Sequence, residues 1–361
     1  MTNRNEYAAS DADPTQREAV TGAMQEKNTK HPLLEVDRLA IAFDTTNASV
    51  RPVRDMSLVI EPEQTLAVVG ESGSGKSLTS LAVMGLLPEQ ARIASGSLRF
   101  EGRDLTELDE EEWNRLRGEQ VAMVFQDPLS ALNPSLSIGY QIAEMFRRHR
   151  GQSREQARER TIALMEEVGI PEPAHRFSAY PHQFSGGMRQ RVVIAMALAL
   201  EPKLLIADEP TTALDVTVQA QILRLLRRRR QEGQAMLIIS HDLGVVARTA
   251  QSVVVMYAGQ AVETGSVPEV YRAPAHPYTS GLMAATPSTG QGKQIRPIEG
   301  QPPDPADLPS GCVFHPRCPF ARERCRKEEP LLRQVAPGRT SACHFAEEVL
   351  SRGTAIDTTG A

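Results

Sequence analysis

The chain alternates between short apolar runs and longer segments in which apolar residues recur at helical spacing. Over 33–60 apolar and polar residues alternate, as in half-buried strands, which predicts an antiparallel sheet at the start of the folded region. The apolar run at 65–69 ends in glycines and precedes a helical pattern over 78–87, which Pro88 closes. Strand and helix patterns then alternate, with strands expected at 204–207, 235–240 and 253–257 and helices at 188–200, 216–230 and 243–249. This alternation is typical of an α/β fold, a mainly parallel sheet with helices on both faces.

Two segments depart from this alternation. At about 131–185 the charge density rises, apolar residues recur at helical spacing, and Gly169 and Pro171 interrupt them, which predicts an inserted helical subdomain within a domain at 33–275. At 276–350 prolines and all four cysteines accumulate, so we expect a separate C-terminal module there. The polar ends of the chain, 1–32 and 351–361, are predicted to be a disordered tail and a flexible tail.

Charge and composition exclude several classes of protein. The 361 residues contain 40 Lys and Arg against 45 Asp and Glu, a balance that argues against an electrostatic nucleic-acid binder. No apolar run approaches the roughly 20 residues that a membrane-spanning helix needs, so any membrane association is expected to be peripheral. The basic run at 227–230 is interpreted as the solvated end of a helix, where positive charge complements the helix dipole.

The segment 70–77, Gly-Glu-Ser-Gly-Ser-Gly-Lys-Ser, fits the phosphate-binding loop pattern GxxxxGK[ST] and lies between an expected strand and an expected helix. Its glycines allow the backbone N–H groups to surround phosphate oxygens, and the following helix N-terminus adds positive potential. Lys76 is predicted to reach the terminal phosphates and Ser77 to offer its hydroxyl to Mg²⁺. The predicted ATP-binding residues in this segment and directly after it are Gly70, Ser72, Gly73, Ser74, Gly75, Lys76, Ser77 and Leu78.

Two adjacent acids end the apolar run at 204–207. A buried strand in this position would deliver Asp208 to the Mg²⁺ site, and Glu209 could polarise an attacking water. Taken alone, the pair could also be a solvated strand end. Its place after a phosphate-binding loop, in the same α/β pattern, favours the catalytic interpretation.

The segment 184–190, Phe-Ser-Gly-Gly-Met-Arg-Gln, resembles the signature of ATP-binding-cassette ATPases, LSGGQ in its common form. The other motifs of that family follow in the expected order, so the resemblance covers roughly 33–275 and implies a RecA-like P-loop NTPase core. In those motifs, Phe43 resembles the aromatic residue that stacks on adenine and Gln126 the Q-loop glutamine. Asp215 resembles the aspartate of the D-loop and His241 the switch histidine.

The resemblance implies a head-to-tail pair of ATPase domains with two ATP molecules between them. It assigns catalysis to Glu209, His241 and Lys76, and ligation of Mg²⁺ to Ser77, Gln126 and Asp208. The signature of one subunit would contact the terminal phosphate of the ATP on its partner. The signature residues concerned are Ser185, Gly186, Gly187 and Met188.

Longer motifs at 125–134, 184–191 and 276–279 resemble the ATPase subunits of oligopeptide and dipeptide importers. Met188 stands where the common signature has Gln. In this it resembles the first of the two ATPase subunits that such importers use, which implies a heterodimer. The resemblance further implies two transmembrane permease subunits, an extracytoplasmic peptide-binding protein and a location on the cytoplasmic face of the inner membrane. Related machinery that imports nickel or glutathione remains an alternative, as does a soluble cassette ATPase outside transport.

The four cysteines, Cys312, Cys318, Cys325 and Cys343, are spaced C-x5-C, C-x6-C and C-x17-C. In a chain without an export signal such a cluster favours thiolate ligation, and four thiolates suit either tetrahedral zinc or an iron–sulfur cluster. The segment resembles the C-terminal region of peptide-importer ATPases, which implies a [4Fe–4S] cluster. Because the sequence shows no site for a redox partner, we expect a structural or regulatory role for it. Four unligated thiols, or zinc with help from His315 or His344, are the alternatives.

Overall fold

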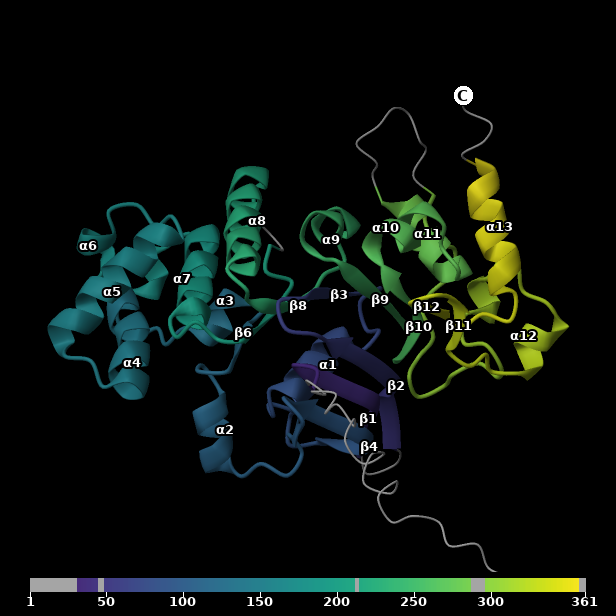
Figure 1. Ribbon diagram of the computed structural model, residues 1–361, viewed down its shortest axis with the longest axis horizontal. Helices are drawn as coiled ribbons and strands as arrows, with labels where there is room; N and C mark the ends of the chain where they lie inside the picture. Colours follow the sequence, from purple (N-terminus) through teal and green to yellow (C-terminus); the bar gives the residue numbers. More distant parts are fainter. Residues whose placement is uncertain (1–30, 45–48, 212–213, 287–295, 357–361) are drawn as a thin grey trace, which may run out of the picture. The chain divides into compact units, whose positions relative to one another are not determined.

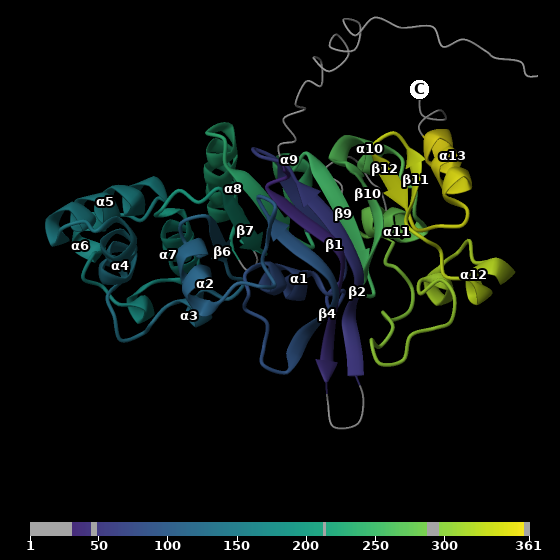
Figure 2. The same ribbon diagram turned by 60° about the horizontal axis from the view of Figure 1, so that its bottom comes forward.

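The computed structural model describes residues 31–44, 49–211, 214–286 and 296–356. The N-terminal tail expected at 1–32 lies almost wholly outside these residues, as does the end of the C-terminal tail after 356. The folded unit that begins at Pro32 is built on a single sheet, shown in Figures 1 and 2.

Twelve strands of the described residues form this sheet, in the order β5-β4-β1-β2-β10-β9-β3-β8-β7-β6, with β12 added beside β10 and β11 beside β12. The strands are β1 Leu34–Asp44, β2 Ser49–Ile60, β3 Thr65–Val69, β4 Ala91–Phe100, β5 Arg103–Asp104, β6 Val121–Val124, β7 Leu204–Asp208, β8 Ala235–Ile239, β9 Ser252–Tyr257, β10 Gln260–Ser266, β11 Arg333–Ala336 and β12 Arg339–Ser341.

The sheet contains both halves that the sequence predicts. Strands β1, β2 and β4 pair antiparallel, which confirms the opening antiparallel sheet. Strands β6, β7, β8, β3 and β9 pair parallel in that order, which confirms the α/β core. Every residue of β3, β7 and β8 is buried, as expected for parallel strands covered on both faces.

Alternate residues of the parallel strands pack against different helices. Leu66 and Val68 of β3 belong to the same buried cluster as Val83 of helix α1 (Lys76–Val83). Ala67 and Val69 point the other way, into a cluster with Val246 of α9 (Leu243–Thr249). Figure 1 accordingly shows α1 and α9 on opposite sides of β3. Because successive strand residues face opposite sides, this alternation produces the three-layer arrangement.

Helix α1 is shorter than predicted. We expected it to run to Leu87, but it ends at Val83, and Gly85 adopts φ +63° just beyond it. The Leu86 N–H donates to the Leu81 carbonyl oxygen at 2.8 Å, the bond that closes a helix with a left-handed C-terminal residue. The glycine therefore ends the helix before the proline can.

The segment between β6 and β7 is helical, as predicted for the insertion. Serine caps begin three of its helices, α4, α5 and α7, and Gly151 in left-handed conformation ends α4. Its interior is continuous with buried residues on one face of the parallel strands. The helices are α3 Pro128–Ala131, α4 Ile138–Arg150, α5 Arg154–Glu167, α6 Pro173–Arg176 and α7 Gly186–Leu198, with a 3₁₀ turn, η2, at Pro181–Gln183.

The C-terminal segment is joined to the main sheet rather than separate from it. Glu263 of β10 is in register with Ser341 of β12, and β11 pairs with β12 in turn. Helix α13 (Ala346–Ile356) continues past 351, so residues 351–356 are helical and not the tail we expected. The other helices are α2 Glu110–Leu116, α8 Val216–Gln231, α10 Val267–Arg272, α11 Pro277–Ala285 and α12 Glu323–Lys327, with a 3₁₀ turn, η3, at His315–Arg317.

Candidate nucleotide-binding site

The glycine-rich loop connects β3 to α1, as its motif requires, and close packing restricts two of its positions to glycine. A Cβ on Gly70 would lie 2.1 Å from the Met256 carbonyl oxygen, and one on Gly75, whose φ is +101°, would lie 2.8 Å from the Pro52 carbonyl oxygen. Ser72 and Gly73 are exposed at the tip of the loop, while Ser74, Gly75 and Lys76 are buried beneath it. Leu78, further along α1, packs against the core.

The Lys76 ammonium group is held inside the loop. Its Nζ lies 2.8 Å from the carbonyl oxygens of Gly70 and of Glu71. Burial lowers the pKa of Lys76 from its ordinary value, and the carboxylates of Glu209, Asp208 and Glu71 oppose that shift. A buried cation held by carbonyl oxygens beneath the loop supplies positive charge for phosphate oxygens.

Asp208 ends β7 beside the start of α1. Burial raises the pKa of its carboxyl group, and a hydrogen bond with the Ser77 side chain opposes that shift. Its Oδ1 is buried and accepts no hydrogen bond within the described part of the chain. A buried oxygen without a partner is unfavourable, and a divalent cation would satisfy it. Asp208 and Ser77 therefore fit the predicted Mg²⁺ site.

Glu209 connects the ends of three neighbouring strands. Its Oε1 lies 3.1 Å from His241 Nδ1, beyond β8, and its Oε2 accepts from Gln126 Nε2 at 3.0 Å, beyond β6. Its backbone adopts φ +47°, a left-handed conformation that is uncommon for any residue but glycine, and its N–H donates to the Ile239 carbonyl oxygen at 2.9 Å. The structure thus brings together the three side chains to which the sequence assigned the attacking water and Mg²⁺.

The remaining predicted residues lie elsewhere on the fold. Phe43, at the end of β1, is in register with Val50 and Ala91. Ser185 begins α7, and its Oγ accepts from the Met188 N–H at 3.4 Å. The signature faces outward: Ser185 and Gly186 are exposed, Gly187 and Met188 half-buried. Asp215 caps α8 by accepting from two backbone N–H groups. Within the described residues, none of these side chains makes a hydrogen bond or ion pair with the phosphate loop.

Sequence reasoning missed a set of contacts from the far end of the chain to the phosphate loop. The Arg317 guanidinium donates to both carboxylate oxygens of Glu71, at 2.6 and 2.9 Å. The Tyr278 hydroxyl oxygen accepts from the Glu71 N–H at 2.8 Å. Neither contact could be found from spacing, because more than 200 positions separate the partners in sequence.

The four cysteines line one small cavity, together with His276, His315 and several aromatic residues. Burial raises the pKa of Cys318 to about 12 and of Cys343 to about 11. Among the residues that the structure describes, however, no group of three or more His, Cys, Asp or Glu side chains is arranged to hold a metal ion. The cysteines converge as the sequence suggested, but their thiols do not form the expected metal site in this arrangement.

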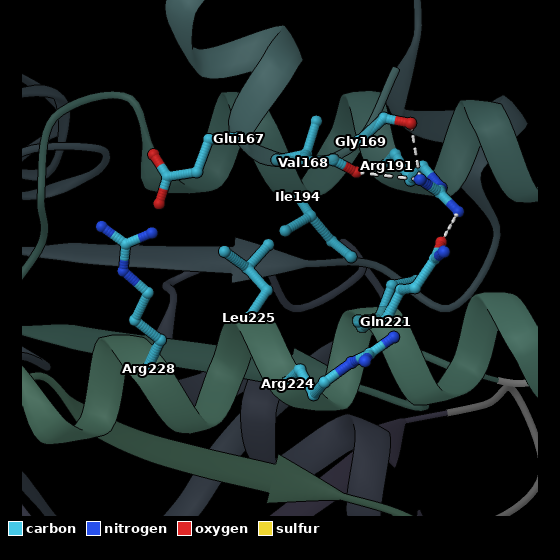
Figure 3. Close-up of a pocket in the computed structure, with 10 residues that line it drawn as sticks. Glu167, Val168, Gly169, Arg191, Ile194, Gln221, Arg224, Leu225 and Arg228 are labelled. Carbon is cyan, nitrogen blue, oxygen red and sulfur yellow. Dashed lines mark hydrogen bonds between the residues drawn. The ribbon is translucent and has the colours of Figure 1, made fainter. Parts of the chain in front are cut away.

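A second cavity, of about 350 Å³, lies between α5, α7 and α8 (Figure 3). Arg191 of α7 donates to the carbonyl oxygens of Val168 at 3.2 Å and Gly169 at 2.6 Å and contacts Gln221 of α8. None of the predicted nucleotide-site residues lines this cavity. It marks the junction at which one arginine joins the inserted helices to the core.

In the part of the chain that the structure describes, no helix is long and apolar enough to span a membrane.

Known proteins resemble this chain in sequence and in fold. Residues 53–212 match the family model described as ABC transporter, and residues 262–325 match the one described as oligopeptide/dipeptide transporter, C-terminal region. Among solved structures, the dimeric post-hydrolysis state of the cassette MJ0796 bound to ADP and Pi superimposes with a TM-score of 0.60 at 24% identity, covering 65% of this chain and 98% of that one. The fold and the site define an ATP-binding-cassette ATPase.

Two curated relatives are similar over nearly their whole length. The dipeptide transport ATP-binding protein DppD of Escherichia coli is 48% identical over 324 residues, 89% of this chain and 99% of the relative. The oligopeptide transport ATP-binding protein OppD of Salmonella typhimurium is 48% identical over 335 residues, 92% and 98% of the two chains. This chain belongs to the family of ATP-binding proteins of dipeptide and oligopeptide ABC transporters.

Proposed function

We propose that this chain is the ATP-hydrolysing subunit of an ABC importer for dipeptides or oligopeptides. The observation that carries the proposal is Glu209, which lies next to the phosphate loop and contacts Gln126 and His241. A carboxylate held between two polar side chains at the end of a buried strand can orient a water for in-line attack on a terminal phosphate. Membership of the peptide-transporter family supplies the class of cargo.

Each part of the site has a role in this reaction. Lys76 and the backbone N–H groups of the loop would bind the phosphates, and Phe43 would contact the adenine ring. Asp208 and Ser77, with Gln126, would hold Mg²⁺, which neutralises phosphate charge when bound. Glu209 would accept hydrogen bonding from the attacking water, and His241 would hold Glu209 and the terminal phosphate in place. Such positioning and charge stabilisation account for most catalysis of phosphoryl transfer.

We infer that a second ATPase subunit completes the site. The exposed Ser185 and Gly186 support this, because a Cβ built on Gly186 meets no atom within 4 Å. In a head-to-tail pair this open N-terminus of α7 would contact the terminal phosphate of the partner's ATP. Met188 at the end of the signature supports a heterodimer.

The assembly that follows from this function includes two transmembrane permeases and an extracytoplasmic peptide-binding protein. The chain would bind the permeases peripherally, on the cytoplasmic face of the inner membrane. Nickel or glutathione as the cargo of the same machinery is the competing proposal, since cargo is selected by the binding protein and the permeases and not by the ATPase site.

The variant Glu209→Gln tests the catalytic assignment. In the assembled complex it should keep ATP binding, because the loop and Lys76 are unchanged, and should release phosphate at least about 100-fold more slowly than the wild type. Glu107→Gln, on an exposed loop, is the matched control and should hydrolyse ATP normally. Normal turnover by Glu209→Gln would remove Glu209 from this role.

We also propose that the four cysteines ligate a [4Fe–4S] cluster, with zinc as the alternative. Their convergence on one cavity supports ligation. Anaerobically purified protein should contain iron and acid-labile sulfide in about equal amounts, and Cys343→Ser should lower both. Stoichiometric zinc without sulfide would show that the cysteines bind zinc and not the cluster. Protein that contains neither iron nor zinc would show that the four thiols are free.

A further inference from the structure

The C-terminal segment reaches the phosphate loop through one buried arginine. Arg317 ends the turn η3, and its side chain is only 5% exposed. Both of its terminal nitrogens donate to the Glu71 carboxylate, at 2.6 and 2.9 Å. Glu71 is the second residue of the phosphate loop. A two-point contact between a guanidinium and a carboxylate fixes both distance and orientation, so it holds the loop more firmly than a single hydrogen bond.

Further contacts fix the arginine to the segment that carries it. Its Nε donates to the Glu299 carbonyl oxygen at 3.0 Å, and Nη1 lies 3.4 Å from the Tyr257 hydroxyl oxygen. The ring centroid of Tyr257 lies 4.5 Å from that of Tyr278 and 5.2 Å from that of Phe314. The three rings form a buried cluster, which also supplies the Tyr278 hydroxyl that accepts from the Glu71 N–H.

The charge of Glu71 needs this partner. Its carboxylate belongs to the loop that is proposed to bind the phosphates of ATP. It lies near enough to Lys76 to raise the pKa of that lysine. Without Arg317, a carboxylate in this position would repel ATP phosphates in a partly desolvated site. With Arg317, the ion pair is neutral and the loop keeps the net positive potential of Lys76 and the helix N-terminus.

We propose that Arg317 is a positioning and charge-compensating residue of the nucleotide site, through which the cysteine-bearing segment sets the affinity of the phosphate loop for ATP. Arg317 directly precedes Cys318, and the Cys318 N–H donates to the His315 carbonyl oxygen within the same turn. The backbone that places the guanidinium is therefore the backbone that places a cysteine. This inference rests on ATP binding by the loop but not on the identity of the cargo.

The test is the dissociation constant for ATP, measured by calorimetry on the full chain without Mg²⁺ so that hydrolysis does not interfere. Arg317→Gln should weaken binding about tenfold, and raising the salt concentration should reduce the difference, because the uncompensated Glu71 charge causes it. Glu71→Gln should bind ATP at least as tightly as the wild type. The double variant should return to within about threefold of the wild type, since its loop again carries no extra negative charge.

Arg322→Gln is the matched control, because Arg322 makes a similar two-oxygen contact, with Glu348, in the same segment. It should not change the dissociation constant. If Arg317→Gln does not fold, Arg317→Lys keeps the charge and should bind ATP within about threefold of the wild type, whereas Arg317→Met should not.

Unchanged affinity in folded Arg317→Gln would overturn the inference. A double variant as weak as Arg317→Gln alone would also overturn it, because a purely structural role of the arginine is not rescued by removing the charge of Glu71. Lys76→Ala separates this failure from failure of the proposed function. This variant should bind ATP poorly whether or not Arg317 has the proposed role. Normal ATP binding by Lys76→Ala would contradict the assignment of the nucleotide site.

Discussion

Glu209 shows how a residue acquires its role from its surroundings. The sequence places a glutamate after a buried strand, which could equally be a solvated end. The structure adds the contacts with Gln126 and His241 and the left-handed backbone at φ +47°. Such backbone strain persists only where neighbouring contacts fix it, and it is concentrated at functional sites. Here the strain turns the carboxylate toward the strand ends that surround the phosphate loop.

Gly85 is a residue whose importance is structural, and its replacement gives a clear prediction. A Cβ there would lie 2.5 Å from the Trp113 ring, and φ is already +63°. Gly85→Ala should therefore lower the free energy of unfolding by about 2 to 3 kcal/mol, from backbone strain and displacement of the ring. Urea denaturation measures this change.

Gly151→Ala is the control for that measurement. Gly151 also ends a helix with φ +60°, but a Cβ there would meet no atom within 4 Å. In the Gly151→Ala variant, backbone strain alone should lower the free energy of unfolding by about 1 kcal/mol. Equal losses in the two variants would show that the indole ring does not contribute.

At the scale of elements, the sequence was most informative where burial is complete. The strand predicted at 65–69 and the helix predicted at 243–249 have the observed bounds, because uninterrupted apolar runs and helical spacing leave few alternatives. It was least informative for β4, β5 and β10 to β12. Their residues are mixed in polarity, and β4, β10 and β12 each pair with a strand far away in the sequence.

The pairing of β12 with β10 illustrates what local patterns omit. It buries Arg339 against Glu263, whose side chains are 6% and 0% exposed, with Nη2 and Oε1 2.7 Å apart. Glu263 also accepts from the N–H groups of Ala275 and His276, at 2.8 and 3.0 Å. A buried ion pair cannot be predicted from the spacing of two charged residues 76 positions apart.

Arg339→Met should lower the free energy of unfolding by about 3 kcal/mol at pH 8, because it leaves a buried carboxylate without its cation. Burial already raises the pKa of Glu263 above its ordinary value, and loss of Arg339 should raise it further. A raised pKa means that stability is greatest below the pKa of the unfolded chain and falls as pH rises through the folded pKa. The loss should therefore be smaller at pH 5 than at pH 8.

Arg333→Met, in the neighbouring strand β11, is the comparison for this pH series. Its ion pair with Glu347 is exposed, with side-chain exposures of 42% and 62%, so its removal should change the free energy of unfolding by less than about 1 kcal/mol. A loss in Arg339→Met that is independent of pH, or no larger than in Arg333→Met, would contradict the assignment of a buried carboxylate.

At the scale of the whole molecule, the nucleotide site draws on both ends of the described chain. The phosphate loop, the acidic strand end and the switch histidine are recognisable as motifs, because their chemistry requires particular residues at particular spacings. Arg317 belongs to no such motif, and the motif at 276–279 that contains Tyr278 does not predict its contact with the loop. Both residues contact Glu71 from more than 200 positions away in the sequence. For a site of this kind, sequence motifs predict the catalytic residues but not the distant residues that hold the phosphate loop in place.

The central claim is that ATP hydrolysis at this chain energises peptide import. The most direct test of this claim is uptake of a labelled dipeptide by proteoliposomes. The proteoliposomes contain the complex that is purified with the tagged chain from the membranes of its own host. The assay also supplies the peptide-binding protein of the complex, and ATP on the side of the membrane that carries this subunit. We predict ATP-dependent uptake with the wild-type chain and none with Glu209→Gln. Uptake that is unaffected by Glu209→Gln, or steady ATP hydrolysis with no peptide uptake, would contradict the claim.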